Sequence, residues 1–105
     1  MQISNEFNRF MHGVVLSYVH SLRYLKIEGL RVGIRPFYLS FDALKQLLKY
    51  LDFDYPRNEL GVPISYTRLS VFDMLSHIAF IQTVLAENGL LQDFLDEFYK
   101  EIESV

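Results

Sequence analysis

The sequence predicts a mainly α protein, a compact bundle of about four helices, with a short two-stranded β-ribbon as an optional addition and an α+β arrangement as the alternative. Three observations favour this class. Apolar residues recur at three- and four-residue steps in four segments, capping residues precede these segments, and half of the 105 residues are hydrophobic. Because no repeat, low-complexity run or linker divides the chain, we expect residues 1–105 to form a single helical domain.

The first predicted helix runs from residue 5 to about residue 27. Ser4 or Asn5 can cap its start, and Gly29 can supply the left-handed residue that ends it. Gly13 lies inside the helix, where glycine lowers stability unless another backbone packs there, so it marks a candidate close helix crossing. The apolar face consists of Phe7, Phe10, Met11, Val14, Val15, Tyr18, Leu22 and Leu25.

Two segments, 30–35 and 62–66, alternate apolar and polar residues with the period of a half-buried strand. Pro36 follows the first and Pro63 lies in the second, so each strand would be short or at a sheet edge, because proline donates no ladder hydrogen bond. These two segments are therefore the candidates for pairing as a small ribbon.

The second predicted helix begins at Ser40 and ends near Asp52. Leu39 and Leu44 form a hydrophobic staple around the Ser40 cap. Its predicted buried face is Phe41, Leu44, Leu47, Leu48 and Leu51, and its wet face is Lys45, Gln46 and Lys49. A long connection follows, from residue 52 to 68, and a loop of that length in a small domain is expected either to hold the strand or to have a function.

The third helix is predicted from a cap at Ser70 to about Asn88, where Asn88 and Gly89 break it. Apolar residues cover nearly its whole circumference, so it is expected to be the central and most buried helix. The last helix is predicted from about residue 90 to 103. Its inward residues are Leu91, Phe94, Leu95, Phe98 and Ile102, and its acidic face is Asp93, Asp96, Glu97, Glu101 and Glu103.

No motif for a metal, cofactor or catalytic group survives a spacing test, so we expect no cofactor, no metal site and no enzymatic activity. The chain has no cysteine, and His12 and His20 lie eight residues apart on one predicted helix, about 12 Å along its axis. The pair Asp52 and Asp54 begins like a calcium loop but lacks its later ligands. His77 is expected at the edge of the core with a local hydrogen bond.

Charge is distributed unevenly along the chain, and this asymmetry carries the functional prediction. Residues 1–50 hold seven basic and three acidic residues, whereas residues 51–105 hold three basic and ten acidic ones. On a straight helix the basic residues form a strip that also carries Leu16 and Ile27 as apolar anchors, a mixture typical of interfaces. The interface candidates are Arg9, His12, Leu16, His20, Arg23, Tyr24, Lys26, Ile27, Arg31 and Arg35.

These observations predict a small, regulatory, non-enzymatic protein-interaction module, such as an adaptor, inhibitor or chaperone-like protein, that binds another protein, itself, or both, as a homodimer. The basic half can face the acidic last helix in one molecule or across a dimer. Nucleic-acid or anion binding by the basic half is the alternative, although the net charge of −3 disfavours it. No apolar run approaches the ~20 residues of a membrane span and no signal-peptide core begins the chain, so we expect a cytoplasmic protein.

Overall fold

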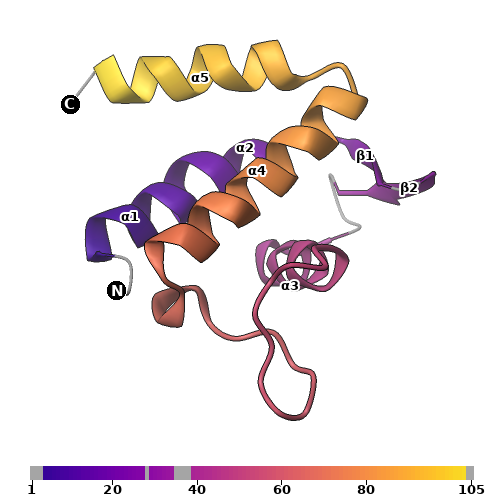
Figure 1. The fold of residues 1–105 in the computed structure, drawn as a ribbon. Coiled ribbons are helices and arrows are strands. Elements are labelled where there is room, and N and C mark those ends of the chain that lie inside the picture. Colours follow the sequence, from indigo (N-terminus) through magenta and orange to yellow (C-terminus); the bar gives the residue numbers. More distant parts are fainter. Residues whose placement is uncertain (1–3, 28, 35–38, 104–105) are drawn as a thin grey trace.

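The computed structural model describes residues 4–27, 29–34 and 39–103, with side chains up to residue 100. It confirms the mainly α fold with a short two-stranded antiparallel sheet. The first helix comprises α1 (Asn5–Phe10), η1 (Met11–Leu16) and α2 (Ser17–His20), and the others are α3 (Phe41–Leu51), α4 (Val71–Glu87) and α5 (Leu91–Glu103). α4 lies at the centre, with α5 crossing above it and the N-terminal helix behind it (Figure 1).

The N-terminal helix begins at the predicted cap, because the Ser4 side chain accepts a hydrogen bond from the Phe7 backbone N–H at 3.1 Å. It ends at His20 rather than near residue 27, and its middle segment η1 is a π-helix. Ser17 Oγ, at the start of α2, donates to the His12 carbonyl of η1, five residues earlier. Gly13 is exposed and a Cβ there would meet nothing within 4 Å, so the predicted close crossing at Gly13 is wrong.

Residues predicted as the end of the first helix instead form strand β1 (Tyr24–Ile27), which pairs with β2 (Leu30–Gly33). The ribbon is confirmed, but its predicted partner segment, 62–66, is wrong. Leu25 and Ile27 are buried and alternate with exposed residues, which is the period of a strand. The sequence prediction assigned these residues to the first helix instead. Pairing neighbours through a short turn, with Gly29 at φ 84°, costs less loop entropy than closing the 26-residue loop between segments 30–35 and 62–66.

The remaining helix ends follow local capping chemistry. Ser40 accepts from the Ala43 N–H at 3.1 Å and Ser70 from the Asp73 N–H at 3.0 Å, so both predicted starts are confirmed. Gly89, at φ 70°, closes α4 through a 2.8 Å bond from the Leu90 N–H to the Leu85 carbonyl.

The core gathers the apolar sides of the four helices, Leu25 and Ile27 of β1, and Ile34 just after β2, and the connection from residue 52 to 70 folds against it. That connection holds an isolated β-bridge between Arg57 and Pro63, and the short 3₁₀ helix η2 (Tyr66–Arg68), and it buries Tyr55, Tyr66 and Leu69. In the part of the chain that the structure describes, no helix is both long and apolar enough to cross a membrane.

Candidate functional site

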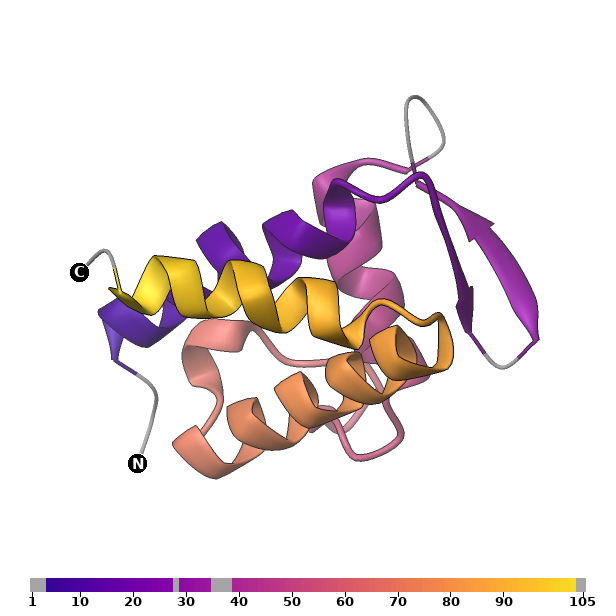
Figure 2. The same ribbon diagram turned by 90° about the horizontal axis from the view of Figure 1, so that it is seen from above.

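One side of α4 is exposed or half-buried over four turns and carries no charge before Glu87 at its C-terminal end. We call it the α4 face; its residues are Phe72, Leu75, Ser76, Ala79, Gln82, Thr83 and Ala86. α4 is central and buries six residues, as expected, but Phe72 is 79% exposed and Leu75 is 55% exposed, so one apolar side of the helix is left uncovered. α5 and the N-terminal helix lie on one side of α4, and none of the described helices or strands lies along the other side (Figure 2).

A groove of about 460 Å³ adjoins this face; we call it the α4 groove. Its lining residues are Ile27, Leu51, Asp52, Phe53, Asp54, Ser76, Ala79, Phe80, Thr83, Val84 and Glu87. Phe53, which is 89% exposed, stands at its edge with most of its ring in water. The charged residues described along it are all acidic, so the groove combines apolar walls with a negative rim.

The β1–β2 hairpin projects from the bundle beyond the C-terminal end of α4 (Figure 2). Ile27 of the hairpin lines the α4 groove, and the exposed charged residues described in the hairpin are basic. Leu30 is 67% exposed at its turn, Lys26 is exposed, and the Arg31 guanidinium lies 4.0 Å from the centroid of the Tyr24 ring. We call Tyr24, Lys26, Leu30 and Arg31 the hairpin tip. The cation–π contact holds Arg31 in place at the surface.

Asn88, just after α4, fixes the hairpin in this position. Its Oδ1 accepts from the Lys26 N–H at 2.8 Å and its Nδ2 donates to the Lys26 carbonyl at 2.8 Å. The same Nδ2 also donates to the Val84 carbonyl at 2.7 Å. The amide therefore pairs with β1 as a neighbouring strand would, and Ile27, the next residue, lines the α4 groove.

The structure divides the predicted basic strip among three places. Leu16 is 1% exposed and Ile27 is 3% exposed, so the expectation that they are outward anchors is wrong. The π-helix explains why Leu16 is buried. At about 4.4 residues per turn, Leu16 lies within about 50° of buried Met11 around the helix axis, whereas an α-helix would place it about 140° away. Ile27 belongs to β1 and faces the core.

The other strip residues also separate. Arg9 is exposed on α1, whereas His12 is half-buried and lines a cavity described below. His20 is half-buried, and its Nε2 lies 3.2 Å from the Leu39 carbonyl oxygen. Arg23, Tyr24, Lys26 and Arg31 gather on or next to the hairpin. Arg35 lies outside the described residues.

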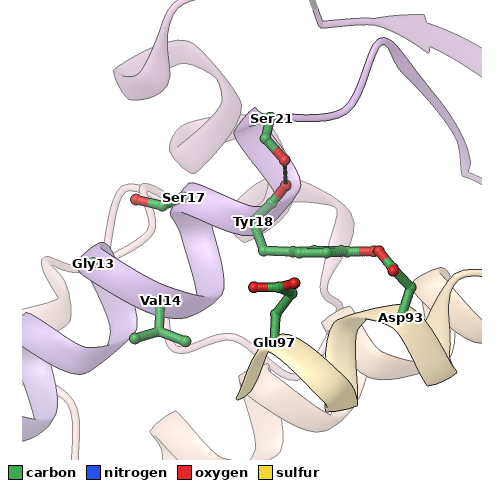
Figure 3. A pocket seen from close by; sticks show the side chains of 7 residues that line it. All are labelled: Gly13, Val14, Ser17, Tyr18, Ser21, Asp93 and Glu97. Carbon is green, nitrogen blue, oxygen red and sulfur yellow. Dashed lines mark hydrogen bonds between the residues drawn. The ribbon is translucent and has the colours of Figure 1, made fainter. Parts of the chain in front are cut away.

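On the predicted acidic face, Asp93, Asp96 and Glu97 are exposed on α5; the side chains of Glu101 and Glu103 lie outside the described part. Tyr18 reaches across from the N-terminal helix and donates from its hydroxyl to Asp93 Oδ2 at 2.6 Å, closing one end of a cavity of about 380 Å³ (Figure 3).

Burial, and then the hydrogen bond to Asp93, raise the pKa of Tyr18. The ion pairs among the described residues are Asp42–Lys45 and Glu97–Lys100, and Asp52 lies against the His77 ring, which is neutral as described below. The N-terminal helix thus meets the acidic face of α5 through a tyrosine, and none of these ion pairs joins a base of the first half to an acid of α5.

A buried polar network that sequence reasoning missed connects the long connection to α4. His77 is 1% exposed, its Nδ1 lies 2.7 Å from Asp52 Oδ2, and its Nε2 lies 2.9 Å from the Tyr66 hydroxyl. Burial lowers the pKa of His77 against the opposing effect of Asp52, so the ring is neutral, donates from Nδ1 and accepts at Nε2.

All three groups of this network are shielded from solvent, which favours a structural role. Its partners come from distant parts of the chain, so the expectation that His77 lies at the edge of the core with a local hydrogen bond is wrong, and no local signal could have revealed the network. Within the described ranges, no group of three His, Cys, Asp or Glu side chains is placed to hold a metal ion.

Comparison of the chain with protein-family models, with curated proteins and with solved structures found no match. A function for this chain is therefore inferred from its own residues.

Proposed function

We propose that the protein is a non-enzymatic interaction module that associates with a second copy of itself, the hairpin tip of each copy entering the α4 groove of the other. The observation that carries the proposal is the juxtaposition, on one molecule, of an apolar groove with an acidic rim and a projecting apolar hairpin with basic flanks. The two surfaces are both apolar at the centre, and their charges are opposite in sign.

The apolar contribution comes from side chains that are unusually exposed. Phe53 lines the groove, Phe72 and Leu75 lie on the adjoining α4 face, and Leu30 is exposed at the end of the hairpin. A large aromatic side chain buries roughly 150–250 Å² when it is covered, and each Å² of apolar surface removed from water contributes about 25 cal/mol. Covering these residues would give the contact the apolar centre that stable interfaces have.

The charged contribution is complementary in sign. Lys26 and Arg31 flank Leu30 on the hairpin, and Asp54 and Glu87 lie on the rim of the groove. Complementary charges at the edge of a contact speed encounter and fix orientation, while the apolar centre supplies most of the affinity. Asp52, also in the groove wall, is already bonded to His77 and is not available for this purpose.

Symmetry supports a closed pair of two copies. Because Ile27 of the hairpin lines the groove of its own chain, hairpin and groove lie next to each other on the molecule. A two-fold axis near Ile27 would therefore place the hairpin of each copy in the groove of the other copy at the same time. Such an isologous contact closes as a dimer, as is usual for soluble homo-oligomers.

Light scattering across a concentration series tests the self-association directly. We expect a mass of twice the chain at high concentration, and a monomer for Leu30→Glu under the same conditions. The matched control is Leu60→Glu, since Leu60 is 87% exposed but does not line the groove; it should remain dimeric. A wild-type monomer at several hundred micromolar, or a Leu30→Glu dimer of unchanged stability, would contradict the proposal.

A charge exchange tests which surfaces meet. The variant Lys26→Glu/Arg31→Glu and the variant Asp54→Lys/Glu87→Lys should each be monomeric, because like charges would face each other in both contacts. Mixed in equal amounts they should form a dimer, since opposite charges face each other again in both contacts. A mixture that stays monomeric would overturn the hairpin–groove contact. If the wild type is monomeric and shifts the mobility of nucleic acid at low salt, the alternative function, nucleic-acid binding by the basic half, would be favoured.

A further inference from the structure

A second cavity, of about 450 Å³, lies between the N-terminal helix, α3 and the segment that leads into η2. Its lining residues are Asn8, His12, Lys45, Gln46, Lys49, Val62, Pro63, Ser65, Tyr66 and Thr67. Its charge is one-sided: two lysines and a histidine line it, and no carboxylate does among the residues described there. This cavity is separate from the α4 groove and shares no residue with it.

Lys49 at the inner side of this cavity is a buried cation without a counter-ion. It is 3% exposed, its Nζ donates to the Ile64 carbonyl at 3.2 Å, and the same atom lies 4.2 Å from the centroid of the Tyr66 ring. None of the ion pairs formed by the described residues includes Lys49. Burying a charge without an opposite charge is costly, so this position calls for an anion.

Lys45 and His12 bring two more nitrogen groups to the same space. The His12 Nδ1 lies 2.8 Å from the Asn8 carbonyl oxygen and donates to it, which leaves Nε2 to accept from Lys45 Nζ at 3.4 Å. Lys45 Nζ also lies 3.7 Å from Asp42, whose side chain is almost fully exposed. An ammonium has three N–H donors, so Lys45 retains one beyond these two contacts.

The polar wall of the cavity continues with neutral groups. Ser65 and Thr67 are exposed at its mouth, and their hydroxyls lie 3.0 Å apart. Asn8 Oδ1 is buried and has no hydrogen-bond partner among the described residues; turning the amide by 180° would place the Nδ2 donor there. The apolar remainder is formed by Val62, Pro63 and the face of Tyr66.

We infer that this cavity binds the phosphate group of a small phosphomonoester. A tetrahedral dianion with three outer oxygens matches two ammonium groups and the hydroxyl side chains at the mouth, whereas a carboxylate offers only two oxygens and one charge. The His12 ring contributes by accepting from Lys45, which positions that ammonium group. The volume exceeds that of a phosphate alone and lies in the range of small-ligand sites, so the apolar wall can accommodate an organic group.

Ligand binding should be linked to proton uptake by Lys49. Burial, and then the neighbouring charge of Lys45, lower the pKa of Lys49 to about 8. The other titratable groups that face it are Tyr55 and Tyr66, whose rings lie against the ammonium, and His77 on α4. A bound dianion favours the protonated lysine, so binding at pH 8 should take up a proton, a signature that a purely structural lysine would not produce.

Isothermal titration with three probes tests the site: phenyl phosphate, inorganic phosphate and benzoate, which keeps the ring of the first but replaces its phosphate. We expect phenyl phosphate to bind at least tenfold more tightly than benzoate. Tighter binding of phenyl phosphate than of inorganic phosphate would identify a phosphomonoester, and equal binding would identify phosphate itself, which overturns the organic part of the inference. Equal affinity for benzoate and phenyl phosphate, or no measurable heat of binding at millimolar ligand, would overturn the inference that this cavity binds a phosphate group.

Three variants localise the binding. Lys49→Met and Lys45→Gln should each weaken phenyl phosphate binding at least tenfold, and Lys49→Met should also abolish the proton uptake measured in buffers of different ionisation enthalpy. Lys100→Met is the matched control, because Lys100 is an exposed lysine on α5, and it should bind as the wild type does. Unchanged affinity in both cavity variants, with folding verified by circular dichroism, would contradict the assignment.

Discussion

The Nδ1 atom of His77 lies 2.7 Å from Oδ2 of Asp52, although 25 residues separate them in the sequence. Asp52 ends α3 and His77 lies in α4, so this one hydrogen bond closes the whole connection between the two helices. Asp52 Oδ1 accepts in addition from the Asp54 N–H, and the Tyr66 hydroxyl occupies the other ring nitrogen of His77. The long connection is therefore fixed at both its beginning and its end.

Replacing Asp52 with alanine should lower the free energy of unfolding by about 3 kcal/mol. The substitution leaves the buried Nδ1–H of His77 and the Asp54 N–H without an acceptor, and a buried donor left unsatisfied costs about 1–3 kcal/mol. Urea unfolding gives the value. Asp54→Ala, a change at an exposed neighbour, should cost less than about 0.5 kcal/mol, and equal losses in the two variants would contradict the argument.

Stability should also fall as the pH falls below 6.5, and His77 should be the cause. Burial lowers the pKa of His77 from its ordinary value of 6.5, so the unfolded chain binds the proton more readily than the folded one. This contribution is complete above pH 6.5 and is lost as the pH decreases from 6.5 through the lower pKa of the folded state. A nuclear magnetic resonance titration of the His77 ring should give a pKa below 6.5; a higher value would mean that Asp52 outweighs burial.

The parts of the fold that local chemistry determines could be predicted from the sequence. Ser40 and Ser70 cap α3 and α4 because each can reach the N–H three residues on, and Gly89 ends α4 because it adopts a positive φ easily. The acidic, exposed side of α5 followed from its periodicity. In each case, the residues that determine the local structure lie within about one helical turn of the feature that they determine.

The errors arose where local patterns were compatible with two structures. Tyr24, Leu25, Lys26 and Ile27 fit the spacing of a helix and the alternation of a strand, and pairing with β2 decided between them. The helical wheel that placed Leu16 on the outer face assumed 3.6 residues per turn, and this spacing does not hold in the π-helix. The exposed α4 face, the groove and the Asp52–His77 bond depend on how helices pack, which periodicity does not encode.

Lys49 was predicted on the wet side of α3 for the same reason, and its burial leads to an unusual expectation for stability. Lys49→Met should raise the free energy of unfolding at pH 7 by about 1–3 kcal/mol, since an apolar side chain of similar length removes a buried charge. The Ile64 carbonyl keeps a donor, the Tyr55 hydroxyl at 2.7 Å.

Urea unfolding at pH 7 and pH 10 provides the check for Lys49. The advantage of Lys49→Met should shrink at pH 10, because Lys49, with a pKa of about 8 in the folded state, is then neutral there. Lys100→Met, on an exposed side chain, should change little at either pH. A variant less stable than the wild type at pH 7 would show that the cation–π contacts and the hydrogen bond outweigh the cost of burial.

Asn88 should control the order of the hairpin, and through it the proposed self-association. Asn88→Ala removes both hydrogen bonds to the Lys26 backbone and the one to Val84, at a cost of about 1–2 kcal/mol, given that each such bond contributes roughly 0.5–1.5 kcal/mol. Hydrogen exchange at the Lys26 N–H should become markedly faster, whereas amides in the centre of α3 should keep their protection. Gln92→Ala, which removes an exposed amide bonded only within α5, is the control.

The Asn88 variant also separates positioning from contact. Asn88 does not belong to the hairpin tip, so weaker dimerisation in Asn88→Ala would show that the groove requires a hairpin held at a fixed angle. Faster exchange at Lys26 with unchanged dimerisation would mean instead that a loosened hairpin still finds its groove. Slow exchange at Lys26 in the variant would contradict the role of Asn88 itself, because the strand would then be held by its β2 pairing and the burial of Leu25 and Ile27 alone.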